Sequence, residues 1–132
     1  MNKNKLIFRI TTSLLALMYL GGGSRYFIEY SFMSDYFELL NFPRWLHPLL
    51  GVTKFMAVIS LVTILLDIKA NPKWLKEWTY AGNFFNAFLA FIAHQMIEES
   101  FDLSVPAIMV LVLVVISRIT WGKLYLTADK EE

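Results

Sequence analysis

The stretch Ala107-Ile-Met-Val-Leu-Val-Leu-Val-Val-Ile116 decides the fold, because it is an unbroken run of apolar residues. Pro106 precedes the run, and proline suits the first turn of a helix because it has no backbone N–H to leave unbonded. The apolar character continues to about Trp121. A helix that spans a bilayer needs about 20 mostly apolar residues, so we expect a transmembrane helix over 105–121.

Three further stretches have the same character, over residues 6–23, 46–66 and 75–97. Each is long and continuous and does not alternate with a period of two, which favours helices over the strands of a membrane β-barrel. The predicted fold class is all-α, a membrane-spanning four-helix bundle that forms a single domain over 1–132. Hydrophobic residues make up 57% of the chain and its mean hydropathy is +0.51, too apolar for a soluble domain of this size.

Composition and motifs exclude several classes of function. The net charge of +1 offers no basic surface for a nucleic acid, and the absence of cysteine excludes disulfides and thiolate metal sites. The sequence contains no HExxH, GxSxG or phosphate-loop motif, so it marks no catalytic residue, metal site or cofactor. His47 and His94 fall near one membrane face, but no other residue supports a haem site.

The basic residues predict the orientation of the bundle. Nine of the twelve lysines and arginines flank the same ends of the four stretches: Lys3, Lys5, Arg9, Lys69, Lys73, Lys76, Arg118, Lys123 and Lys130. By the positive-inside rule this side faces the cytoplasm, and both termini lie there. Residues 1–23 also fit a cleavable secretory signal peptide, which would leave three spans in the same orientation.

The segment Ser24–Asn41 is predicted to be an amphipathic helix that connects the first two spans. On a helical wheel its polar residues gather on one side and its aromatic residues on the other. Such a helix suits the outer membrane surface or a cap on the bundle.

Polar residues inside the spans define a candidate pocket. Asn83, Asn86 and His94 fall on one side of the helix over 75–97, opposite its aromatic residues, and Glu98 follows one turn later. Because polar side chains in a span turn inward, this side is expected to face the bundle and Lys54 of the helix over 46–66. The pocket would lie in the outer half of the bilayer. Alternatively, these residues only fasten the helices together.

The sequence leaves several environments open for the Lys54 side chain. It can snorkel to the membrane surface, lose its charge through desolvation, or pair with Glu98 or Glu29. Near the cytoplasmic side, Glu77 or Asp67 is expected to form a structural ion pair with an arginine.

The two arginines that reach that level are Arg118 and Arg9.

Three stretches resemble the DoxX-like family of membrane proteins. They are Leu40-Asn-Phe-Pro-Arg-Trp-Leu46, Leu50-Gly-Val-Thr-Lys-Phe-Met-Ala57 and Leu75-Lys-Glu-Trp-Thr-Tyr-Ala-Gly-Asn-Phe-Phe-Asn86. The chain departs from the family pattern at Asn41, Thr79 and Ala93, which replace glycine, alanine and serine. The resemblance implies a small four-helix protein of the bacterial cytoplasmic membrane and implies no settled activity.

We therefore expect a non-catalytic binding or accessory subunit whose polar pocket lies between the helices. A second interpretation is a membrane redox component that handles quinone or a small sulfur species, in line with the oxidoreductase subunit for which the family is named. A third is a small-molecule transporter that works as an oligomer. The expected partners are the lipid bilayer, a membrane or redox protein, and further copies of the chain.

Overall fold

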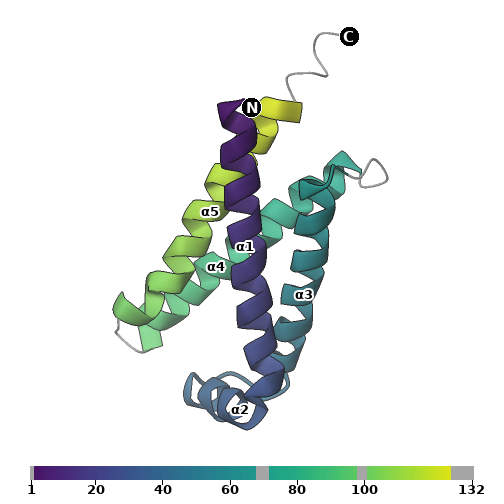
Figure 1. Ribbon diagram of the computed structural model, residues 1–132. Coiled ribbons are helices and arrows are strands. Elements are labelled where there is room, and N and C mark those ends of the chain that lie inside the picture. Colours follow the sequence, from purple (N-terminus) through teal and green to yellow (C-terminus); the bar gives the residue numbers. More distant parts are fainter. Residues whose placement is uncertain (1, 68–71, 98–100, 126–132) are drawn as a thin grey trace.

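The computed structural model describes residues 2–67, 72–97 and 101–125, and these residues form five helices (Figure 1). The all-α prediction is confirmed. The helices are α1 (Lys3–Ile28), α2 (Tyr30–Leu39), α3 (Leu46–Leu65), α4 (Lys73–Ile97) and α5 (Phe101–Tyr125).

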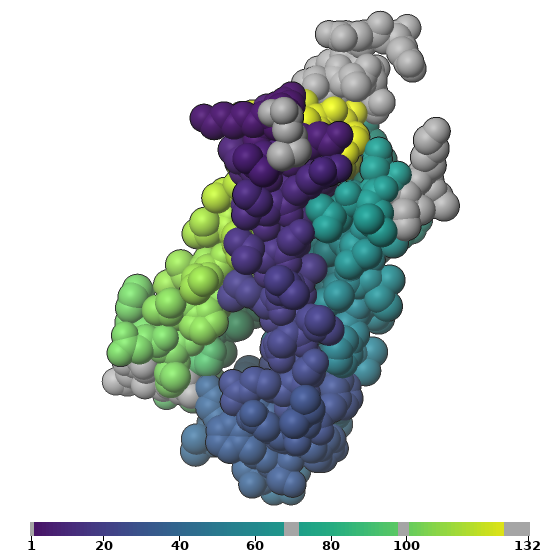
Figure 2. All heavy atoms as spheres, viewed as in Figure 1, coloured from purple at the N-terminus to yellow at the C-terminus, as the bar shows by residue number. Residues whose placement is uncertain are grey.

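Helix α1 is the centre of the arrangement and packs against α3 on one side and α5 on the other (Figure 1). Helix α4 runs behind α1, from beside one end of α3 to the far end of α5, and α2 lies across the end of α1 and α3. The beginning of α1 and the end of α5 lie at the same end of the molecule. At the opposite end the space-filling view shows a gap between α5 and α2, so the bundle splays there (Figure 2).

Three helices, α1, α3 and α5, are long and apolar enough to cross a membrane by length and composition. Helix α4 has 25 residues and a length of about 37 Å, enough for a span, but its polar residues make it less apolar. Large apolar side chains such as Leu17, Met56 and Leu89 are more than 60% exposed, which suits contact with lipid tails. The chain is a multi-pass helical membrane protein.

The core lies where α1 meets α3, α4 and α5. Its buried residues come from all four helices and include four aromatic side chains: Phe8, Leu15, Tyr19, Leu61, Ile64, Tyr80, Val114 and Trp121. The orientation expected for α4 is confirmed, since Tyr80, Asn83 and Ala87 are buried whereas Phe85 and Leu89 are exposed.

Helix α1 continues five residues beyond the predicted end at Gly23, to Ile28, and the chain bends at Glu29. Gly21, Gly22 and Gly23 do not end the helix. The lack of a side chain at Gly23 instead allows α3 to approach α1 closely. A Cβ placed on Gly23 would lie 3.2 Å from the Cβ of Lys54, and one on Gly51 would lie 2.7 Å from the Phe27 ring. The connecting helix is therefore only α2, and residues 24–28 belong to α1.

Helix α2 ends in a Schellman motif centred on Asn41, whose φ of 60° is left-handed. The Phe42 N–H donates to the Phe37 carbonyl at 2.8 Å, and the Asn41 N–H donates to the Glu38 carbonyl at 3.0 Å. Asparagine tolerates this backbone conformation, so it can stand where the family pattern has glycine.

Helix α5 begins at Phe101, four residues before the predicted start, so Pro106 lies in its second turn rather than its first. The proline removes the N–H that would bond to the Asp102 carbonyl, a loss confined to the start of the helix. Asp102 favours the earlier start because its charge complements the helix dipole.

Candidate functional site

A cavity of about 470 Å³ lies between α3 and α4, and Tyr19 of α1 forms part of its wall. We call this cavity the central cleft. Helices α3 and α4 are joined by a hydrogen bond between the Ser60 and Thr79 hydroxyls but otherwise make few direct contacts. The crossing of α4 behind α1 leaves the space between them (Figure 1). Polar residues line part of the central cleft: Tyr19, Thr53, Lys54, Ser60, Thr79, Asn83 and Asn86. The rest of its lining is apolar: Leu50, Met56, Ala57, Leu75, Trp78 and Gly82.

Lys54 reaches the central cleft along the glycine-rich face of α1. Its Nζ donates to the Tyr26 hydroxyl at 3.3 Å and lies 4.5 Å from the centre of that ring. A Cβ on Gly22 would lie 3.4 Å from this Nζ, so the ammonium group lies close against α1. The half-buried lysine therefore stays inside the bundle.

Of the two carboxylates predicted as alternative partners of Lys54, the one that the structure describes, Glu29, pairs with another residue. Glu29 accepts a hydrogen bond from Arg25 at 2.8 Å, which lowers the pKa of the Glu29 carboxyl below its ordinary value. Glu98 lies outside the described residues. Within 2–67, 72–97 and 101–125, no carboxylate forms an ion pair with Lys54.

Asn83 and Asn86 line the central cleft from α4, together with Lys54 as the sequence predicts. Asn83 is only 3% exposed, and its backbone carbonyl accepts a hydrogen bond from the Tyr19 hydroxyl at 3.1 Å. The Nδ2 of Asn83 is buried without a hydrogen-bond partner among the described residues. The central cleft thus holds an ammonium group with one hydrogen-bond partner and an amide Nδ2 with none among the described residues.

His94 does not line the central cleft. It follows Asn83 by eleven residues, about 16 Å along α4, where α4 lies beside α5 rather than α3 (Figure 1). At that level the Gln95 Nε2 donates to the Ser104 hydroxyl of α5 at 2.6 Å. The prediction that His94 belongs to the pocket assumed helices that run side by side, and the tilt of α4 removes it.

Glu77 and Arg118 form an ion pair between α4 and α5. The Nε and Nη2 of Arg118 each lie 2.7 Å from one carboxylate oxygen of Glu77. Arg9, the other predicted partner, is exposed and takes no part, and Asp67 lies 3.7 Å from the Nζ of Lys76 instead.

Next to this ion pair, three buried hydroxyls connect three helices. The Ser117 hydroxyl lies 2.7 Å from that of Thr12 and 2.9 Å from that of Tyr80. Because it joins α1, α4 and α5 in the core, this network holds these three helices together.

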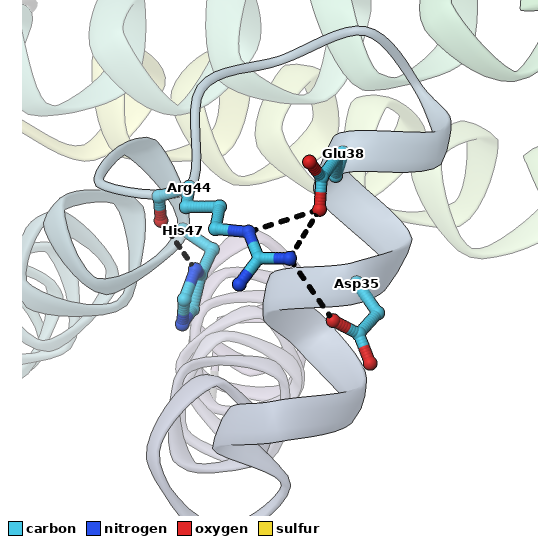
Figure 3. Close-up of polar contacts among 4 residues, drawn as sticks. All are labelled: Asp35, Glu38, Arg44 and His47. Atoms are coloured by element: carbon cyan, nitrogen blue, oxygen red, sulfur yellow. Dashed lines mark hydrogen bonds and ion pairs between the residues drawn. The ribbon is translucent and has the colours of Figure 1, made fainter.

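The α2–α3 corner is held by a second polar group (Figure 3). The Arg44 Nε donates to Glu38 at 2.9 Å, and its guanidinium also faces Asp35 at 3.8 Å. The hydrogen bond with Glu38 raises the pKa of Arg44, which stays charged. The Arg44 carbonyl accepts the Nδ1–H of His47 at 2.7 Å, and this fully buried histidine packs against the Tyr30 ring. The corner closes the bundle about two turns of α3 from Lys54, since His47 precedes Lys54 by seven residues.

Sequence reasoning did not identify Tyr19 and Tyr26, which bond to Asn83 and Lys54. A signal for them exists in the spacing, because Tyr19, Gly23 and Tyr26 recur at intervals of four and three residues on one helix face. Small residues on that face mark the close approach of another helix, and the neighbouring tyrosines then meet its side chains.

The residues that the structure describes contain no cluster of three or more His, Asp or Glu side chains placed to hold a metal ion. Comparison with known families gives a match to the DoxX-like family over residues 10–117, which covers α2, α3 and α4 and most of α1 and α5. No curated protein and no solved structure matches the chain.

Proposed function

The chain belongs to the DoxX-like family, and on this basis we propose that it is a non-catalytic binding subunit that holds a small, largely apolar molecule in the central cleft. The observation that carries the proposal is the incomplete hydrogen bonding of Lys54, which has only the Tyr26 hydroxyl, and of the Asn83 Nδ2, which has no partner among the described residues, in a partly apolar cavity. Buried polar groups without partners are costly inside a membrane protein. A molecule bound between α3 and α4 would supply the missing partners.

The setting we propose is the bacterial cytoplasmic membrane, with both termini in the cytoplasm. The excess of lysine and arginine at one end of the bundle supports this orientation. Helix α3 then enters from the outer side at Leu46, and Lys54 lies about 12 Å along it. The part of the central cleft that holds Lys54 would then lie in the outer half of the bilayer.

The test is retention of a small molecule by the purified protein. Wild-type protein, Lys54→Met and Asn83→Ala are extracted from membranes into lipid nanodiscs and analysed by native mass spectrometry. We expect wild type to carry a bound molecule and both variants to carry less than about a tenth as much, because each loses a hydrogen-bonding group that faces the ligand.

Lys5→Met is the matched control, since it removes an exposed lysine at the start of α1, away from the central cleft. Equal retention by wild type and a folded Lys54→Met would contradict the proposal. A quinone released from the central cleft would favour the redox interpretation, and solute uptake into proteoliposomes would favour transport.

A further inference from the structure

We propose that the molecule bound in the central cleft is a single-chain amphiphile with a carboxylate head, which binds to Lys54 and Asn83 while its tail lies along the apolar lining. This inference rests on the binding function proposed above and specifies its ligand class. It follows from three properties of the described residues: charge, hydrogen-bonding balance and the shape of the apolar surface.

The charge of the central cleft is positive and has no counter-charge among the described residues. Lys54 contacts the hydroxyl and ring of Tyr26, which satisfy part of the ammonium group but carry no negative charge. Glu29, the described carboxylate that the sequence predicts as a partner of Lys54, is held by Arg25 instead. A cation in a membrane interior is stabilised most by an anion at contact distance, so an anionic ligand fits better than a neutral one.

The hydrogen-bonding groups that remain in the central cleft are mainly donors. Thr53 donates to the Leu50 carbonyl of its own helix, and Thr79 donates to the Leu75 carbonyl and also contacts Ser60. The Tyr19 hydroxyl donates its hydrogen bond to the Asn83 backbone carbonyl.

The groups left are the other ammonium protons of Lys54, the buried Nδ2 of Asn83, and the amide of Asn86. One charged donor accompanied by neutral amide donors suits a carboxylate, which carries a negative charge and two acceptor oxygens. A ketone or quinone oxygen would accept the hydrogen bonds but would leave the lysine charge without a counter-charge.

The remaining surface of the central cleft suits a hydrocarbon chain. Leu50, Met56, Leu75 and Trp78 line it, and Met56 and Trp78 are 63% and 72% exposed at its rim. The rim thus lies on the lipid-facing side of α3 and α4, where an amphiphile can enter from the bilayer. The volume of about 470 Å³ lies within the range of about 300–1,000 Å³ typical of small-molecule sites.

The experiment compares a fatty acid with its own methyl ester. Protein in phosphatidylcholine nanodiscs is titrated with a photoactivatable palmitic acid and with the methyl ester of the same probe, and the crosslinked residues are identified by mass spectrometry. We expect crosslinks on the central cleft and at least about tenfold tighter binding of the acid, because only the acid supplies a charge to Lys54. Lys54→Gln keeps a donor but not the charge, so its affinities for acid and ester should become equal. Lys5→Gln is the control and should keep the preference for the acid.

The contrary outcomes distinguish a failure of this inference from a failure of the proposed function. If acid and ester crosslink in the central cleft with equal affinity in wild type, the carboxylate head is wrong and the binding function stands. If phosphatidylglycerol displaces the acid at equal concentration, the site takes anionic lipids generally and a single-chain carboxylate is wrong. If neither probe reaches the central cleft and the purified protein carries no small molecule, both proposals fail. Loss of the preference in Lys5→Gln would show that the preference reflects overall charge and would overturn the inference.

Discussion

Gly51 is the residue at which the smallest chemical change would most disturb the packing of α1 against α3. A Cβ at this position would lie 2.7 Å from the Cε2 of Phe27 and 3.0 Å from the Cβ of Tyr26. The Phe27 ring can rotate away, but the Cβ of Tyr26 moves only with the α1 backbone. Tyr26 also holds the Nζ of Lys54, so packing at Gly51 and the geometry of the central cleft are coupled.

Gly51→Ala is therefore expected to lower the free energy of unfolding by about 1–3 kcal/mol, the usual cost of overpacking a well-packed contact. The measurement is thermal unfolding of the purified protein in detergent, followed by tryptophan fluorescence. Gly21→Ala is the control, because a Cβ there meets nothing within 4 Å and alanine favours a helix over glycine by about 1 kcal/mol. A Gly51→Ala protein as stable as Gly21→Ala would show that α1 and α3 are not in close contact.

At the scale of elements, two kinds of contact connect helices that are distant in the sequence. Apolar packing and the Thr12–Ser117–Tyr80 hydroxyls hold α1, α4 and α5 together, whereas α3 and α4 meet mainly through Ser60 and Thr79. Helix α4 is thus tied firmly to α5 and loosely to α3. This unequal attachment is why a cavity lies on the α3 side of α4.

The Glu77–Arg118 ion pair is expected to strengthen the α4–α5 contact by a measurable coupling energy. Its two side chains are 37% and 33% exposed, so solvent screening limits the coupling to about 1 kcal/mol or less. A double-mutant cycle with Glu77→Gln and Arg118→Gln measures it from unfolding at low and high salt, and the coupling should fall as salt increases.

The exposed pair Arg25–Glu29 provides the comparison, because it lies at the end of α1 and joins no two helices of the bundle. Its cycle should show no measurable coupling to the stability of the fold. Equal coupling in the two cycles, or none for Glu77 and Arg118, would mean that the ion pair does not fasten α4 to α5.

At the scale of the whole molecule, the structure places the start of α1, the end of α3, the start of α4 and the end of α5 toward one end and α2 at the other (Figure 1). An arrangement of this kind follows when α1, α3, α4 and α5 all cross the membrane. The charge distribution then predicts which end faces the cytoplasm.

The topology is tested with single cysteines, which are unambiguous because the natural chain has none. Exposed positions are chosen: Ser31 on α2 for one side, and Asn2 and Pro72 for the other. We expect a membrane-impermeant maleimide to label Cys at position 31 in intact cells, and to label the other two only after the membrane is permeabilised. Labelling in the reverse pattern would contradict the orientation. The mass of the purified protein shows whether residues 1–23 are retained.

The amount that could be predicted from the sequence differs between the fold and the central cleft. The predicted ranges 46–66 and 75–97 agree with α3 and α4 to within two residues, and the inward side of α4 was recognised from the 3.6-residue period. Lys54, Asn83 and Asn86 were placed together correctly as cavity-lining residues. His94 was not, because residue counting gives depth along a helix and says nothing of the direction in which the helix leans.

What the sequence determined by itself is therefore what local chemistry controls: helical secondary structure, membrane insertion and the inward-facing side of α4. Apolar run length and periodicity carry this information because every backbone group in a bilayer must be satisfied within its own helix. The tertiary structure alone decided that Arg118 rather than Arg9 meets Glu77, that Tyr26 meets Lys54, and that α4 crosses toward α5. These outcomes depend on how the surfaces of neighbouring helices interlock, which sets crossing angles through the shapes of many side chains at once.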